Sequence, residues 1–204
     1  MTRLRELAGP ASVGLYLGAL AVIQATGHPD WETLTSSADA VAHGRVWVLL
    51  SSGLVIDGDP WLQWAVLGAV MIFALVRLGA GRMWACGLSA HVGSALLAYA
   101  GLGVIYAIDP SQTDPDEPDY GVSVLFAGLL GALATSGTRR QAALIAIVSL
   151  AGFSIGLQDA SWLANAEHVL GFAIGALLNL ELDRRARTRA AAAANPPAGG
   201  RVAI

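Results

Sequence analysis

Long apolar runs separated by short polar connections dominate the hydropathy pattern of the chain. A helix needs roughly 20 apolar residues to cross a bilayer, with about 17 as the lower end of the range. Six runs approach or reach that length: residues 11–27, 61–78, 84–107, 120–136, 141–157 and 165–181. Glycine or proline lies at many of their ends, where helices commonly start or stop. The pattern predicts an all-α membrane protein with six transmembrane helices in one domain, residues 1–185.

The composition of the chain favours lipid as its solvent. Hydrophobic residues make up 55% of the sequence and charged residues only 13%, which is about half the charged share of a soluble domain. Such a chain cannot cover itself with polar surface. The first apolar run follows Arg3 and Arg5, so a secretory signal peptide is the alternative for this segment. The run is long for a signal peptide and no good cleavage site follows, which favours a membrane anchor.

Arginines and acidic residues fall on opposite sides of the predicted membrane. Arginines precede the first run, flank the turn between the second and third, separate the fourth from the fifth and follow the sixth. Arg45 is the exception. All but three of the 15 acidic residues, namely Glu6, Glu181 and Asp183, lie in the other connections. Arginine-rich connections are cytoplasmic in membrane proteins. We therefore expect an integral protein of a bacterial plasma membrane, with both termini in the cytoplasm.

Two outer connections and the C-terminal tail differ in character. The first connection, residues 28–60, contains an apolar stretch at 41–56 that is too short to span and is typical of an interfacial or re-entrant segment. Within it, Arg45 and Trp47 are side chains that favour the membrane interface. Residues 109–119 are acidic and proline-rich, which predicts a solvated loop. The tail, residues 186–204, is predicted to be disordered.

Ser123 and His168 are polar side chains near the outer ends of two apolar runs. Ser123 comes about three residues after the acidic loop, roughly 5 Å along a helix, and His168 comes about three residues after Asn165. Both runs enter from the outer side in the predicted topology, so the two groups lie at similar depth. A neutral histidine in contact with a serine hydroxyl can take its proton and create a nucleophile. The alternative is a serine hydroxyl that bonds a backbone carbonyl of its own helix.

Small residues indicate that the helices carrying this pair pack closely. Gly171 and Gly175 form a G-x-x-x-G that shares a face with His168, and Gly131 lies on the face of Ser123. Such glycines let two helix backbones approach each other, although they are also common where packing is their only role. His91 lies near the cytoplasmic end of its run, which places it far in depth from Ser123 and His168, and it is interpreted as a helix-packing hydrogen-bond donor. The single cysteine, Cys86, excludes an internal disulfide and a cysteine-based metal site.

Several of these segments resemble rhomboid intramembrane serine proteases. G-V-S at 121–123 followed by FAGLLGALA is similar to the start of their fourth helix, and EHVLG-x-x-x-G from residue 167 is similar to their sixth. GRVWVLLSSGLVI at 44–56 resembles their long first loop. The resemblance covers nearly the whole chain to about residue 182. It implies a six-helix rhomboid-like bundle in which Ser123 is the nucleophile and His168 the general base.

The resemblance also implies the partners of the site. The substrate is a transmembrane segment of another membrane protein, cut near the outer face within the lipid bilayer, with no metal or organic cofactor and no nucleic acid. Two departures from the family pattern bear on activity. Val124 replaces the second glycine of G-x-S-G, and residues 59–68 lack the histidine and asparagine that serve the oxyanion hole. Gln63 and the backbone at Gly121 are the remaining candidate oxyanion groups.

Three functions stay open at this point. The first is an intramembrane serine protease. The second is a rhomboid-like pseudoprotease, which binds the transmembrane segments of client proteins without cutting them. The third is an unrelated six-helix membrane protein such as a small transporter, which would need polar groups at mid-membrane that this sequence scarcely offers.

Overall fold

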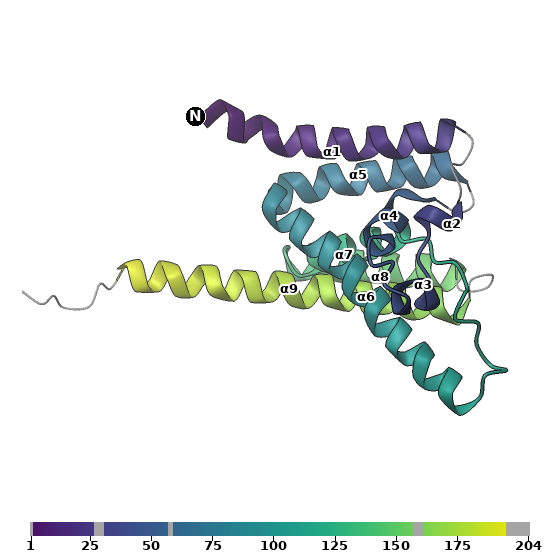
Figure 1. Ribbon diagram of the computed structural model, residues 1–204. Helices are drawn as coiled ribbons and strands as arrows, with labels where there is room; N and C mark the ends of the chain where they lie inside the picture. The colour runs from purple at the N-terminus through teal and green to yellow at the C-terminus, as the bar shows by residue number, and fades with distance from the viewer. Residues whose placement is uncertain (1, 27–30, 57–58, 157–160, 195–204) are drawn as a thin grey trace, which may run out of the picture.

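The computed structural model describes residues 2–26, 31–56, 59–156 and 161–194, which are almost entirely helical (Figure 1). One isolated antiparallel bridge, Ser36 to Asp119, is the β pairing among these residues. The elements are α1 (Thr2–Ala25), α2 (Trp31–Leu34), α3 (Ala38–Ala42), α4 (Val48–Ser51), the 3₁₀ helix η1 (Ser52–Leu54), α5 (Pro60–Leu78), α6 (Ala80–Ile108), α7 (Val122–Ala134), α8 (Arg139–Gly156) and α9 (Trp162–Ala194).

The six apolar runs of the sequence correspond to the six longer helices. Within the described residues, four helices are long and apolar enough to cross a membrane: α5, α6, α9 and the part of α1 from Leu7 to Ala25. The helix α7 is apolar but has 13 residues, fewer than the roughly 17 that a perpendicular span needs. The start of α1 and the end of α9 lie on the same side of the bundle (Figure 1).

Local sequence signals explain where α5 begins and ends. The carboxylate of Asp59 accepts hydrogen bonds from the amides of Trp61 and Leu62, at 3.1 and 3.0 Å, and Pro60 occupies the first turn. An acidic cap and a proline at this position are typical of a helix start. Gly79, with a φ of 76°, ends α5 and turns the chain into α6, a conformation that costs glycine little.

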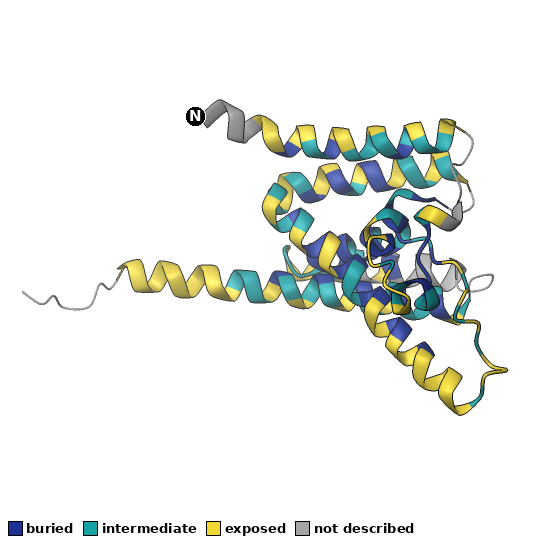
Figure 2. Ribbon diagram, in the orientation of Figure 1, coloured by how far each residue is buried: buried dark blue, intermediate teal, exposed yellow. Residues whose placement is uncertain are grey.

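The centre of the molecule is the packing of α6, α7 and α9 (Figure 2). Glycines permit this packing because their partners are backbone atoms. A Cβ atom on Gly131 would lie 2.0 Å from the carbonyl oxygen of Phe172, and one on Gly175 would lie 2.0 Å from that of Gly128. At the inner end, the Asn179 amide donates to the carbonyl of Ala132 at 3.2 Å. The helices α7 and α9 are therefore in direct backbone contact over most of the length of α7.

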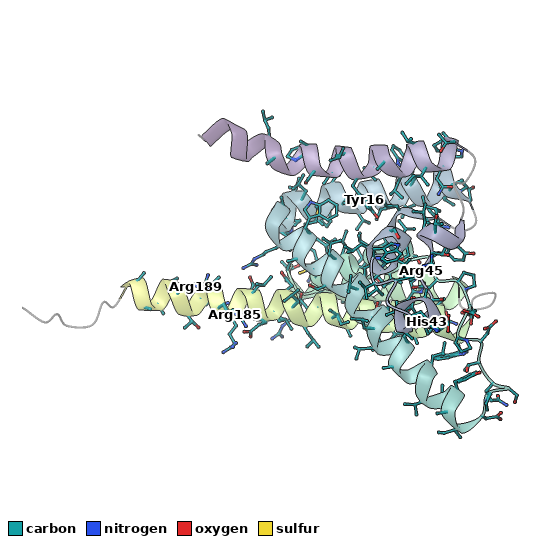
Figure 3. The ribbon with its side chains drawn as sticks, viewed as in Figure 1. Tyr16, His43, Arg45, Arg185 and Arg189 are labelled. Carbon is teal, nitrogen blue, oxygen red and sulfur yellow. The ribbon has the colours of Figure 1, made fainter. Side chains whose placement is uncertain are left out.

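The first outer connection forms a cap that enters the bundle. Val48, Ser52 and Ile56 are buried, whereas Trp47 and Leu50 of the same segment are exposed. In Figure 3, Tyr16 points from α1 toward this segment, and its hydroxyl donates to the carbonyl of Gly53 at 2.5 Å. The apolar stretch at 41–56 thus has one face in the protein core, as in a re-entrant segment.

The helix α9 extends further than the sequence predicts. It continues to Ala194, so residues 186–194 are helical where a disordered tail is expected, and residues 195–204 lie outside the described part. Alanine and arginine are strong helix formers, and the preceding apolar part of α9 supplies the helix nucleus. The extension projects from the bundle and carries Arg185 and Arg189 on its surface (Figure 3).

Candidate functional site

Contacts between α7 and α9 fix the relative depth of Ser123 and His168. Gly171 lies against Val124, Gly175 against Gly128, and Asn179 bonds to Ala132, each pair separated by 47 positions. Gly131 contacts Phe172 and Ala176, which are 41 and 45 positions away. Subtracting 41 to 47 from 168 places His168 level with residues 121–127. Ser123 belongs to that segment, so the two side chains are within about one helical turn, 5.4 Å, in depth.

The orientation of Ser123 on α7 differs from that of its neighbour Val124. Val124 is 2% exposed and points at Gly171, whose absent Cβ would lie 2.9 Å from its Cγ1. Consecutive helical residues are rotated by about 100°, so Ser123 lies beside the α9 contact and not within it. Ser123 is half-buried. Val124 therefore fills the space over Gly171, and Ser123 lies to the side of that contact.

His168 is half-buried, and its hydrogen bond identifies its tautomer. Nδ1 lies 2.5 Å from the carbonyl oxygen of Ala164, one turn earlier in α9. A carbonyl can only accept, so Nδ1 carries the proton and Nε2 carries the lone pair. This is the tautomer that a general base needs.

Gly121, the glycine of G-V-S, is required by the imidazole of His91. A Cβ atom on Gly121 would lie 1.8 Å from Cε1 of His91 and 2.4 Å from its Nδ1. The ring is also packed on Gly53, and its Nε2 is 3.5 Å from Oγ of Ser52. The prediction that His91 lies far in depth from Ser123 and His168 is wrong, because its ring contacts Gly121, two residues before Ser123. The helix α6 is long and tilted across the bundle (Figure 1), so its twelfth residue reaches the start of α7.

The start of α7 offers backbone donors beside Ser123. Gly121 is the N-cap and has no side chain to cap the helix. The amide of Val124 donates to the carbonyl of Gly121 at 3.1 Å, whereas the amides of Val122 and Ser123, the first two residues of the helix, have no partner within it. The amide of Gly121 itself donates to the carbonyl of Ser52 at 3.1 Å. This hydrogen bond joins the connection between α1 and α5 to the start of α7. Amides at a helix N-terminus, together with the helix dipole, favour a negatively charged ligand.

A buried polar network lies above the same helix ends. The Asp119 carboxylate, 6% exposed, accepts from the Tyr99 hydroxyl at 2.9 Å and from the Ser36 hydroxyl at 3.2 Å. The Ser36 and Tyr99 oxygens are 2.7 Å apart. The amide of Asp119 also donates to the carbonyl of Ser36 at 2.7 Å. The network joins the first outer connection, α6 and the start of α7.

Glu167 is the site residue that sequence reasoning missed. The sequence suggests an outer-loop acid, but Glu167 is 0% exposed and continues the buried line of Leu163, Gly171 and Gly175 along α9. Its carboxyl lies against that of Asp119. The four-residue spacing to Gly171 was a usable signal, because i and i+4 share a helix face.

The other predicted residues are distributed as follows. Gln63 lies near the N-terminal end of α5, on the same helix face as the buried Leu67 and Met71. The Arg45 guanidinium lies 6.0 Å from the ring centre of Trp47, whose side chain is 58% exposed at the outer surface. Among the described residues there is no group of three or more histidine, cysteine or acidic side chains that can hold a metal ion.

Comparisons of the chain with protein-family models, with characterised proteins and with solved structures give no match. The part of the chain that the structure describes is helical with one isolated β-bridge, and four of its helices are long and apolar enough to cross a membrane.

Proposed function

We propose that the chain is a rhomboid-like intramembrane serine protease that cuts transmembrane segments of other membrane proteins. Ser123 is the nucleophile and His168 the general base. The observation that carries the proposal is the contact between α7 and α9, which puts both side chains within about one turn in depth near the outer ends of two parallel helices. In this proposal α7 and α8 also cross the membrane, giving six spans with both termini in the cytoplasm.

The chemistry follows from the groups at these helix ends. Nε2 of His168 takes the proton of the Ser123 hydroxyl while Oγ attacks the carbonyl carbon of the scissile peptide bond. The resulting oxyanion is stabilised by the amides at the start of α7, which have no side-chain cap. His168 then donates its proton to the leaving amine, and an acyl-enzyme remains on Ser123. A water molecule, deprotonated by His168, hydrolyses the ester and releases the second product.

Backbone donors substitute for the side-chain donors that the family pattern supplies and this sequence lacks. Loss of one oxyanion donor lowers the rate of a serine protease by about 10² to 10³. In this proposal the backbone donor is the amide of Ser123 in the first turn of α7, because the amide of the N-cap, Gly121, donates to the carbonyl of Ser52. Activity well below that of an efficient protease is the expected outcome.

Cleavage of a panel of fluorescent single-span substrates in liposomes tests the proposal. The wild-type protein cuts at least one substrate, and Ser123→Ala and His168→Ala reduce product to background. Ser136→Ala and His43→Ala are matched controls, since Ser136 bonds the carbonyl of Leu133 at the inner end of α7 and His43 is exposed in the outer connection. The proposal fails if Ser123→Ala cuts as fast as wild type, or if wild type cuts no substrate of the panel.

A client-binding pseudoprotease is the second candidate, and one observation favours it. The 2.5 Å bond from His168 to Ala164 directs the imidazole toward the outer end of its own helix, which is away from a serine at equal or greater depth. In that case a transmembrane segment co-purifies equally with wild type and with Ser123→Ala, and no product appears with either protein.

A further inference from the structure

The contact between Asp119 and Glu167 needs a proton to be stable. Both carboxyls are buried, at 6% and 0% exposure, and the side chain of Glu167 neighbours that of Asp119. Neither oxygen of Glu167 has a donor among the described residues. Two carboxylates in contact in a buried site repel each other, whereas one shared proton converts the contact into a strong hydrogen bond. Asp119 is then the acceptor for three donors: Ser36, Tyr99 and the protonated Glu167.

The position of this pair in the chain connects it to the proposed chemistry. Asp119 lies four residues before Ser123, and Glu167 directly precedes His168. The pair therefore joins the segment that carries the nucleophile to the helix that carries the base. Resting on the protease function proposed above, we propose that Asp119 and Glu167 form a positioning pair, which holds Ser123 and His168 at the separation that proton transfer requires.

General packing of α7 on α9 does not need this pair. Gly128, Gly131, Gly171 and Gly175 already bring the two backbones together, and Asn179 ties the inner ends through Ala132 and Thr135. What the glycines leave undetermined is the placement of the loop before α7, since their contacts begin at Val124. The Asp119–Glu167 contact acts on that loop, so its effect is on the rate of the chemical step more than on helix association.

Five variants separate positioning from a purely structural role. Glu167→Gln keeps a donor toward Asp119 without a titrating proton, and Glu167→Leu removes the donor but keeps the volume. Asn179→Leu is the matched control, because it breaks a buried polar contact between the same helices at the far end. Asp119→Leu is made alone and in combination with Glu167→Leu. Thermal unfolding of these variants in detergent measures whether the two side chains are coupled.

The expected results are specific for each variant. Glu167→Leu lowers kcat about tenfold to a hundredfold with KM nearly unchanged, because a misplacement of about 1 Å has an effect of that size. Glu167→Gln retains kcat within about twofold, and Asn179→Leu lowers the unfolding temperature but leaves kcat within about twofold. The double variant unfolds no lower than Asp119→Leu alone, since the contact can be lost only once.

Three outcomes overturn the proposal, and they are distinguishable. Wild-type kcat in Glu167→Leu means that the pair does not position the dyad. A loss in Glu167→Gln as large as in Glu167→Leu means that a shared hydrogen bond is not the cause. Absence of cleavage by wild type, with coupling between Asp119 and Glu167 intact, means that the protease function itself fails and the positioning role fails with it.

Discussion

Replacement of Gly121 by alanine is the sharpest test of the packing at the start of α7. The new methyl would lie 1.8 Å from Cε1 of His91, where ordinary contacts begin at 3.4 Å, so ring and backbone must separate by about 1.6 Å. The imidazole is 1% exposed and is held on its other side by Gly53. The backbone of Gly121 cannot rotate away, and burial limits the room into which the His91 ring can move. Overpacking of a core by one methyl costs about 1–3 kcal/mol, and this site belongs at the upper end.

The compensating variant is His91→Ala. Alone it leaves a cavity and costs about 2–4 kcal/mol, in the range of other large-to-small core substitutions. Combined with Gly121→Ala it removes the clash, and the methyl occupies part of the cavity. The double variant is therefore more stable than the sum of the two single effects, by about 2 kcal/mol, a typical coupling for residues in contact.

Reversible unfolding in detergent, followed by helical circular dichroism, measures these differences in the free energy of unfolding. Gly101→Ala, on the exposed side of α6 with nothing within 4 Å of the added Cβ, is the control and leaves stability equal or slightly higher. The reasoning is refuted if Gly121→Ala is as stable as Gly101→Ala, or if the two substitutions at 121 and 91 are simply additive.

Three further predictions follow from other contacts. Gly175→Ala places a methyl 2.0 Å from the carbonyl oxygen of Gly128, so it lowers the free energy of unfolding by about 3 kcal/mol or more, whereas Gly18→Ala, with nothing within 4 Å, does not. Tyr99→Phe removes a donor from the buried Asp119 carboxylate, so it lowers the free energy of unfolding by about 1–3 kcal/mol and speeds amide exchange at Ser36 and Asp119. Unchanged stability and exchange would mean that solvent already reaches the carboxylate. The backbone carbonyl and then the carboxylate of Asp39 raise the pKa of His43 above its ordinary value, so an NMR titration finds a raised His43 pKa in wild type and a partly lowered one in Asp39→Asn. The favourable contact is present at low pH and is lost as the pH rises through the pKa of His43. An unshifted His43 pKa in wild type contradicts the prediction.

The helical layout was accessible from sequence because apolar runs and their terminal glycines and prolines are local signals. The six predicted ranges coincide with α1 and α5–α9 to within a few residues, apart from the ends of α1 and α9. Those ends extend because Arg- and Ala-rich flanks continue a helix beyond its apolar part. The glycines of α7 and α9 were also informative, because regularly spaced glycines on one helix face have few explanations other than the close approach of two helix backbones.

The site itself was only partly accessible. Placing Ser123 and His168 by depth assumed helices perpendicular to the membrane, and this assumption gave the wrong location for His91 on the tilted α6. The charge pattern groups Glu167 with the acidic residues of the predicted outer connections, and an isolated carboxyl ordinarily avoids burial. Its burial depends on Asp119, Tyr99 and Ser36, which come from three other parts of the chain. No local pattern contains that information.

The most direct test of the Ser123–His168 dyad is the site and rate of reaction with a fluorophosphonate, which modifies only an activated serine. The protein in detergent is treated with the reagent, digested and mapped by mass spectrometry. We predict a single phosphonylated peptide containing Ser123 in wild type, and a rate at least about 10²-fold lower in His168→Ala, the lower end of what a general base contributes. Modification at another serine, or at Ser123 with an unchanged rate in His168→Ala, would contradict the dyad.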